Sequence, residues 1–243
     1  MNVLILGCGY TGQRVAERFR ARGATVTGTN RSWDLADIRR AVTPGVLVLH
    51  SVPPVTNVLE ALADAPARVV YLSTTGVYGS AAAVDENTPV EPDTERARLR
   101  LEEEQRVTAG PWSWLILRPA AIYGPGRGIL WTSRPKVPPG KPAADRKACP
   151  TYVSRIHVDD LAAHVEAALL SSITGAYPVA DEHPSTPQEI AEFCSQLLNT
   201  QVEPRESRSS RRVDGSAIRR LLGITLRYPS YREGLTQQPL PRL

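Results

Sequence analysis

The feature that most constrains the fold lies at the start of the chain, where an apolar strand runs into a glycine-rich turn and then into a helix. Residues 2–6 read NVLIL, and Gly7, Gly9 and Gly12 follow with the spacing Gly-x-Gly-x-x-Gly. The helix expected over residues 10–22 places its apolar residues on one face. A first glycine permits a tight turn, a second lets a phosphate approach the backbone, and a third lets the helix pack on the strand. This arrangement predicts a dinucleotide site with the pyrophosphate at the helix N-terminus.

The second expected strand, residues 24–29, indicates which dinucleotide is bound. An acidic residue at its end would bind the ribose 2′-hydroxyl of NAD, whereas an arginine accommodates a 2′-phosphate. The chain reads Asn30-Arg31-Ser32 here and has no acid before Asp34. We therefore predict NADP(H) as cofactor in preference to NAD(H). The alternative is that Arg31 is a solvated loop charge.

Strand-like and helical segments alternate along the rest of the chain. Further strands are expected at residues 45–50, 67–73, 112–117 and 176–180, and further helices at 55–63, 93–107, 158–170 and 187–198. Such alternation predicts an α/β fold, a doubly wound parallel sheet with helices on both faces. We expect a single domain spanning residues 1–243. Within it, the proline-rich stretch 124–150 and residues 176–243 are expected to contribute a small substrate-binding lobe.

Composition excludes several classes of protein. No apolar run reaches about 18 residues, so no membrane span is predicted. Three widely spaced cysteines without metal spacing indicate reduced thiols, a cytoplasmic location and no metal site. The net charge of +4 favours anionic ligands but does not predict nucleic-acid binding. The arginine cluster at residues 205–212 is interpreted as a solvated surface with some chance of touching a substrate phosphate. We expect a small-molecule substrate and a monomer or homodimer.

Four ordered motifs carry a resemblance to a known family. They are residues 71–79 (YLSTTGVYG), 117–127 (LRPAAIYGPGR), 155–162 (RIHVDDLA) and the C-terminal set 210–213, 221–223 and 228–234. Together with the glycine turn, the first three resemble the extended short-chain dehydrogenase/reductase superfamily of the NAD-dependent epimerase/dehydratase type. The C-terminal set looks like the atypical subgroup of that superfamily. The resemblance implies a Rossmann fold and covers nearly the whole chain.

The resemblance implies a catalytic set that this chain has only in part. In the superfamily a Ser or Thr, a Tyr, and a Lys four residues after that Tyr carry the chemistry, and Thr74 matches the hydroxyl position. When Glu104 is matched to the usual helix glutamate, Arg96 stands at the Tyr position and Arg100 at the Lys position. The sequence contains no Tyr-x-x-x-Lys. The residues expected to contact the cofactor are Gly7, Gly9, Tyr10, Thr11, Gly12, Asn30, Arg31, Ser51, Val52, Ser73 and Arg100.

Other side chains are weaker candidates for chemistry. Tyr78 and Tyr123 are expected near the carboxyl edge of the sheet, where either one is a candidate acid or base or, alternatively, a packing tyrosine. We interpret His157 and the two acids after it as the joint between a strand and a helix, bonded to backbone, rather than as a metal or hydrolase site. His164 is expected on a helix surface, and His50 has no predicted partner.

Two functions remain open at this point. The first is an NADP(H)-binding oxidoreductase or epimerase/dehydratase-like enzyme acting on a polar substrate, with nucleotide-linked compounds among the candidates. The second is a sensor or regulatory protein that binds NADP(H) without turnover, suggested by the missing Tyr and Lys.

Overall fold

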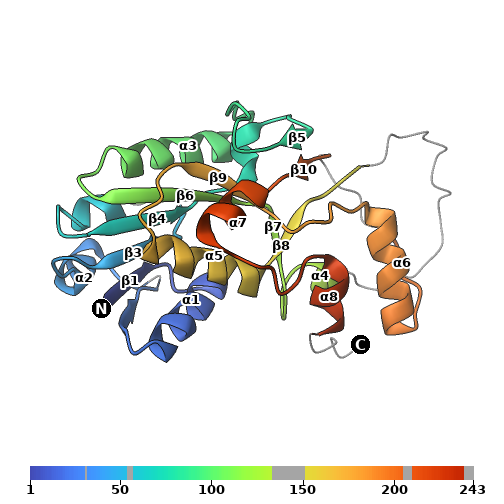
Figure 1. Ribbon diagram of the computed structural model, residues 1–243, viewed down its shortest axis with the longest axis horizontal. Coiled ribbons are helices and arrows are strands. Elements are labelled where there is room, and N and C mark those ends of the chain that lie inside the picture. The colour runs from blue at the N-terminus through green and yellow to red at the C-terminus, as the bar shows by residue number, and fades with distance from the viewer. Residues whose placement is uncertain (31, 54–56, 133–150, 205–209, 238–243) are drawn as a thin grey trace.

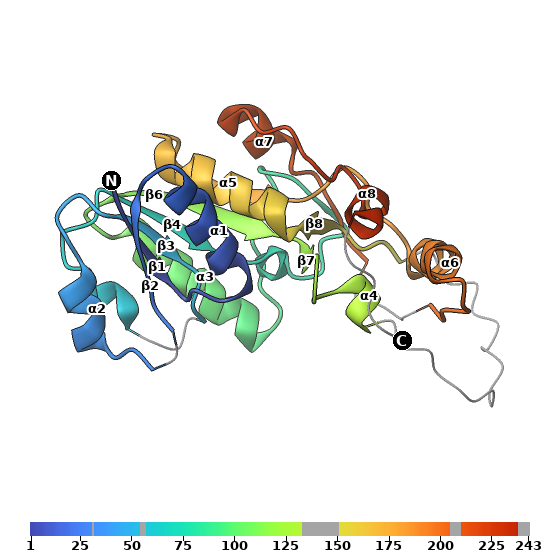
Figure 2. The ribbon, with the colours of Figure 1, turned by 90° about the horizontal axis from the view of Figure 1, so that it is seen from below.

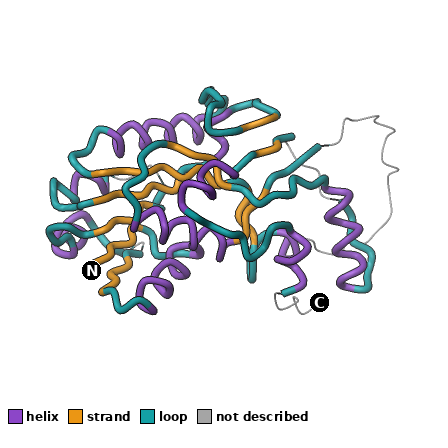
Figure 3. The backbone as a smooth tube through the Cα atoms, in the orientation of Figure 1, coloured by secondary structure: helices purple, strands orange, loops and turns teal. Residues whose placement is uncertain are grey.

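The computed structural model describes residues 1–30, 32–53, 57–132, 151–204 and 210–237, and it is built around one parallel sheet (Figures 1 and 3). In spatial order the strands are β2 (Thr25–Gly28), β1 (Asn2–Leu6), β3 (Leu47–His50), β4 (Arg68–Leu72), β6 (Ser113–Pro119) and β9 (Ala176–Val179). Each neighbouring pair is parallel. The predicted doubly wound α/β fold is confirmed.

The sheet is buried on both faces, which explains why its strands are continuously apolar. In β1, Val3 and Ile5 pack into one core, while Leu4 and Leu6 pack into the other. Successive strand residues point to opposite faces, so a fully apolar strand serves two cores at once.

Two groups of helices cover these faces (Figure 2). On one face pack α1 (Tyr10–Ala21), α5 (Val158–Leu170) and α7 (Ser216–Leu222). On the other pack α2 (Leu35–Ala41), the 3-10 helix η1 (Val58–Ala61) and α3 (Glu95–Thr108). The helix expected over residues 55–63 is thus reduced to a single 3-10 turn, and residues 54–56 lie outside the described residues.

Capping side chains fix where two of the longer helices begin. Thr94 accepts a hydrogen bond from the Ala97 backbone at the start of α3. Thr186 and Glu189 form a capping box at the start of α6 (Pro187–Leu198). These caps satisfy backbone N–H groups that the helix itself leaves unpaired. The predicted bounds of α5 and α6 are confirmed.

A small lobe lies beyond the carboxyl edge of the sheet. Its elements are β7 (Ala121–Tyr123), β8 (Arg155–His157), α4 (Ile129–Thr132), α6 and α8 (Tyr231–Thr236). Figure 1 shows α6 and α8 at the end of the molecule away from α2, and residues of α6, α8 and the β7–α4 segment share a separate core. A second short sheet pairs β5 (Ala83–Val84) with β10 (Arg212–Val213).

The lobe boundary expected from the sequence is wrong at one point. The strand expected at residues 176–180, assigned to the lobe, is β9, which pairs with β6 at the edge of the central sheet. The C-terminal helix α7 also packs on the main sheet, because Ile218 belongs to the core beneath α1 and α5. These two segments therefore belong to the main sheet and its covering helices, whereas residues 133–150, also expected in the lobe, lie outside the described residues.

Helix α3 is fastened to the sheet by two buried carboxylates. Arg118 of β6 donates two hydrogen bonds to Glu104, at 3.0 and 2.6 Å, and both side chains are almost fully buried. His50 at the end of β3 lies 2.7 Å from the Glu103 carboxylate. The expectation that His50 has no partner is wrong, because its partner lies 53 residues away in the sequence.

We predict that Glu104→Ala destabilises the protein by about 3–5 kcal/mol, because it leaves the Arg118 guanidinium buried without its counter-charge. Glu102, two residues earlier and exposed, provides the matched control, and Glu102→Ala should change stability by less than about 0.5 kcal/mol. Urea unfolding of both variants measures the difference. Equal losses in the two variants would show that the buried pair does not fasten α3.

Candidate functional site

The main cleft lies at the carboxyl edge of the sheet, where β1 is flanked by β2 on one side and β3 on the other. Ligands of open parallel sheets bind at such a reversal of strand order. Two adjoining pockets share Gly7, Gly9 and Ser51 here. We call the one of about 310 Å³ the arginine pocket and the one of about 560 Å³ the Trp33 pocket.

The three glycines of the turn have different roles. Gly7 has φ +87°, and a Cβ there would lie 2.9 Å from the Val52 side chain. A Cβ on Gly12 would lie 2.7 Å from the Gly7 carbonyl oxygen. A Cβ on Gly9 would meet nothing within 4 Å. Gly7 and Gly12 are therefore required by packing, whereas Gly9 leaves open space in front of the helix.

The N-terminus of α1 has the chemistry to hold an anion. Its N-cap is Gly9, which supplies no capping side chain, and its first turn contains no acidic residue. Thr11 and Gly12 line the arginine pocket at this positive end of the helix. The Tyr10 hydroxyl donates a hydrogen bond to the Pro125 carbonyl at 3.0 Å, which joins the turn to the β7–α4 segment.

The end of β2 is uncharged over its described residues. The Thr29 hydroxyl accepts a hydrogen bond from the Gly7 backbone at 3.0 Å, and the Asn30 side chain accepts hydrogen bonds from the backbone and hydroxyl of Ser32. Arg31, on which the NADP(H) prediction depends, lies outside the described residues. The adjacent pocket is lined mainly by apolar side chains suited to a flat ring, and these are Trp33, Ile38, Val52, Pro53 and Val58.

Three arginines line the other pocket. The Arg100 Nη1 atom donates to the Tyr71 hydroxyl at 3.0 Å and to the Leu72 carbonyl at 3.2 Å, so its guanidinium is held at the ends of β3 and β4. Arg96, one turn earlier on α3, is exposed. Arg127 stands over the Tyr10 ring, 5.3 Å from its centre. Arg127 is a lining residue that the sequence motifs do not predict, although it follows the turn Gly124-Pro125-Gly126.

Two hydroxyl side chains at the end of β4 face the arginine pocket. Thr74 begins the 3-10 helix η2 (Thr75–Tyr78), and its Oγ1 accepts a hydrogen bond from the Gly76 backbone at 3.1 Å. The hydroxyl proton of Thr74 is therefore not used by that cap. The Ser73 hydroxyl is buried and has no hydrogen-bond partner among the described residues.

Neither candidate tyrosine lines this cleft. Tyr78 is buried, and its hydroxyl accepts a hydrogen bond from Arg118 at 3.0 Å. The Tyr123 hydroxyl donates to the Ser230 carbonyl at 3.1 Å, within the lobe core. Burial raises the pKa of both hydroxyls. Both hydroxyls are thus engaged by contacts outside the cleft, which favours the interpretation of both as packing tyrosines, and neither is proposed below as an acid or base.

The His157 segment is a structural joint. The His157 Nδ1 atom accepts a hydrogen bond from the Asp159 backbone at the start of α5. Both Asp160 oxygens accept backbone N–H groups, from Arg227 and Tyr228. No three potential metal ligands come together among the described residues. His164 is fully buried between helices, so the expectation that it lies on a surface is wrong.

The C-terminal arginine cluster is only partly solvated. Arg211 donates hydrogen bonds to the backbone carbonyls of Thr75, Gly79 and Ala81, tying β10 to the segment after β4. The interpretation of Arg211 as a surface charge is wrong, because three carbonyls occupy its guanidinium. Arg212 stacks over the Tyr152 ring at 3.7 Å, and residues 205–209 lie outside the described residues.

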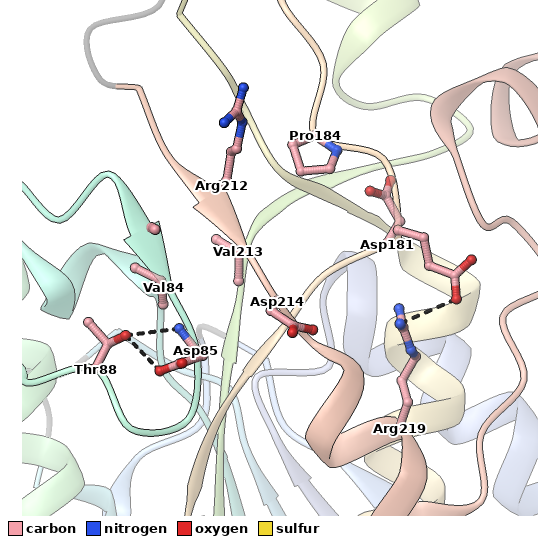
Figure 4. A pocket seen from close by; sticks show the side chains of 11 residues that line it. Val84, Asp85, Thr88, Asp181, Pro184, Arg212, Val213, Asp214 and Arg219 are labelled. Carbon is pink, nitrogen blue, oxygen red and sulfur yellow. Dashed lines mark hydrogen bonds and ion pairs between the residues drawn. The ribbon is translucent and has the colours of Figure 1, made fainter.

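A separate pocket of about 460 Å³ lies between β5, β10 and the segment after β9 (Figure 4). Asp181, at its wall, accepts a hydrogen bond from the His183 backbone through one oxygen, while the other oxygen is buried and has no hydrogen-bond partner among the residues that the structure describes. Burial raises the pKa of Asp181 to about 8. Arg219, which also lines the pocket, pairs with Glu182 at 3.3 Å and donates a hydrogen bond to the Ala180 carbonyl. Nothing in the sequence pattern signalled this pocket.

Every helix in the described parts of the chain is too short or too polar to cross a bilayer.

Comparisons with known proteins agree with this architecture. The chain is 26% identical to Protein YeeZ of Escherichia coli K12, over 93% of this chain and 96% of that protein. It is 30% identical to a conserved protein of unknown function from Silicibacter pomeroyi, whose structure superposes with a TM-score of 0.76 over 96% of each chain. A putative NAD-dependent epimerase/dehydratase from Methylobacillus flagellatus superposes with a TM-score of 0.79 at 26% identity, over 97% of this chain and 96% of that one.

The sequence profile of one family matches the chain from residue 35 to residue 175, a span that contains η2, α3 and the β7–β8 segments. That match covers more than half of the chain. The sheet order, the glycine turn at the first strand and the structural relatives agree with it. The chain belongs to the NAD-dependent epimerase/dehydratase family.

Proposed function

We propose that the protein binds NADP(H) and acts as an oxidoreductase or epimerase/dehydratase-like enzyme on a polar substrate, with nucleotide-linked compounds among the candidates. The observation that carries the proposal is the open space in front of Gly9, at a helix N-terminus without a capping side chain. A dinucleotide held there brings to the cleft a nicotinamide, which supplies or accepts a hydride.

The cleft offers a surface for each part of the cofactor. The backbone at Gly9, Thr11 and Gly12 suits the pyrophosphate. The Trp33 pocket suits the adenine, with Asn30, Ser51 and Val52 at its edge. Ser73 and the fixed guanidinium of Arg100 are proposed to contact the nicotinamide ribose. Tyr10, the first residue of α1, lines the same pocket next to the glycine turn. Gly7 gives the turn its shape.

Thr74 is proposed as the group that orients the reacting oxygen. Its Oγ1 accepts from Gly76, so its proton is free to donate to a substrate carbonyl. A guanidinium is not a proton-transfer group in the neutral range, so neither Arg96 nor Arg100 is assigned that role. We infer that the proton needed when a carbonyl is reduced reaches the oxygen from water through Thr74. The substrate would lie between residues 73–78 and the lobe.

A second function is favoured by one observation, the engagement of both candidate tyrosine hydroxyls outside the cleft. Without a tyrosine acid, the protein is also suited to act as an NADP(H)-binding sensor. Tight cofactor binding with no reduction of any compound in a panel of carbonyls would favour the sensor over the enzyme.

We predict that Gly9→Val abolishes NADPH binding and leaves the melting temperature nearly unchanged. The added side chain meets no protein atom near its Cβ but occupies the space proposed for the pyrophosphate. Fluorescence titration and thermal unfolding measure the two effects. Gly12→Val is the contrasting variant and should lower the melting temperature, because its Cβ would crowd the Gly7 carbonyl. Normal NADPH binding by Gly9→Val would show that the glycine turn is only a turn.

We predict that NADP(H) binds more tightly than NAD(H), and that Arg31→Ala removes the preference. The described end of β2 has no carboxylate to repel a 2′-phosphate, and an arginine forms charge-assisted hydrogen bonds with it. Parallel titrations of the unaltered protein and Arg31→Ala with NADPH and NADH measure the ratio of the two dissociation constants in each protein. Equal affinities for the two cofactors in the unaltered protein would contradict the prediction.

We predict that Thr74→Ala lowers any measured turnover about 100-fold, the usual scale for losing one positioned acid–base or hydrogen-bonding group. The affinity for NADP(H) should change less than twofold, because Thr74 is proposed to act on the substrate. Turnover of the unaltered protein should itself be slow compared with the typical value of about 10 per second. Full turnover by Thr74→Ala would place the reacting oxygen elsewhere.

A further inference from the structure

The arginine pocket contains more positive charge than its other lining groups offset. Arg96, Arg100 and Arg127 line it, and no aspartate or glutamate is among the described residues that do so. Three guanidinium groups therefore line one pocket of about 310 Å³. A bound dinucleotide would bring its pyrophosphate to the α1 end of this space. The position of each arginine therefore decides whether it could bind the pyrophosphate or a negatively charged group of the substrate.

Two of these arginines are already engaged. Arg100 is held by the Val52 and Leu72 carbonyls and the Tyr71 hydroxyl. Arg127 stands over Tyr10, the first residue of α1, and so faces the end proposed for the pyrophosphate. Arg96 differs from both, because it is exposed and its side chain makes no hydrogen bond or ion pair with any residue that the structure describes.

The position of Arg96 is electrostatically unfavourable in the absence of an anion. It is the second residue of α3, and the positive end of a helix dipole disfavours a cation in the first turn. The neighbouring Arg98 is compensated by Glu95, 3.4 Å away. Arg96 has no such compensation within the described chain, and it points to a pocket without carboxylates.

Ser73 provides an independent indication of a missing ligand. Its side chain is only 6% exposed, its hydroxyl has no partner among the described residues, and it lines the same pocket. Leaving a buried hydroxyl unpaired costs free energy, so a ligand group that accepts or donates a hydrogen bond there is favoured. The hydroxyl can accept a hydrogen bond from the nicotinamide ribose and still donate its own proton to an anion, so the proposed cofactor contact leaves its donor for the substrate.

We propose that Arg96, with help from Ser73, binds an oxyanion of the substrate, a carboxylate or phosphate group carried close to the carbon that reacts at Thr74. The inference rests on the proposed function and names the substrate class, anionic compounds. Arg96 stands at the position where the resemblance implies a catalytic tyrosine. In this protein the side chain at that position would bind the substrate instead of transferring a proton.

The test uses the full chain saturated with NADPH, so that the pyrophosphate position is filled. Calorimetric titration with malonate and with inorganic phosphate compares the two sources of an oxyanion, and malonamide is the neutral counterpart. At least one anion should bind, and malonamide should bind at least about tenfold more weakly. Arg96→Gln should weaken anion binding at least about tenfold, the scale of one lost charge-assisted hydrogen bond.

Arg98→Gln is the matched control on the same helix and should leave anion affinity within about twofold of the unaltered value, because Arg98 does not line the pocket. Ser73→Ala should also weaken anion binding. NADPH affinity of Arg96→Gln should stay within about twofold of the unaltered protein, which separates a substrate contact from a cofactor contact.

Three results would overturn the inference alone. They are NADPH binding without binding of either anion, equal anion affinity in the unaltered protein and Arg96→Gln, and a parallel loss of NADPH affinity in Arg96→Gln. Failure of the unaltered protein to bind NADPH would instead contradict the proposed function, and the inference with it.

Discussion

The contact on which the cleft depends is the attachment of α3 to the sheet. Two neighbouring glutamates of this helix reach the strands on either side of β4: Glu103 contacts His50, the last residue of β3, and Glu104 contacts Arg118 of β6. Burial alone would raise the pKa of Glu103, but the hydrogen bonds from His50 and Arg106 and the positive charge of Arg106 outweigh it and hold the pKa below its ordinary value. Burial lowers the pKa of His50, so a neutral imidazole donates to a carboxylate. Such pairs add little net stability, but they cost several kcal/mol to break, and they therefore fix the register of the helix.

That register decides what lines the cleft. With α3 held in this way, Arg100 reaches the ends of β3 and β4, and Arg96, one helical turn earlier, lines the same pocket. An arginine keeps its charge throughout the neutral range, so the positive field of the pocket does not change with pH as that of a tyrosine–lysine pair would. The arrangement is suited to holding anions in place and poorly suited to passing protons.

Much of the framework could be predicted from local signals. The glycine turn, the alternation of elements and the bounds of α5 and α6 follow from residues that are close in sequence, such as Thr186 and Glu189 at one cap. The errors have a common cause, long-range packing. The sequence predicts no partner for His50 because Glu103 is 53 residues away, and it predicts a surface position for His164, which packing buries completely. Likewise, Tyr78 and Tyr123 lie near the predicted edge, but Arg118 and Ser230 take up their hydroxyls.

A crystal structure of the protein with bound NADPH tests the central claim most directly, because it identifies which side chain faces the reactive ring. The account predicts the pyrophosphate at the backbone of Gly9 and Gly12, the nicotinamide against Thr74, and the Arg96 guanidinium free of cofactor contacts and facing the space left for the substrate. A pyrophosphate bound by Arg96, or a nicotinamide lying against a tyrosine hydroxyl instead of Thr74, would contradict it.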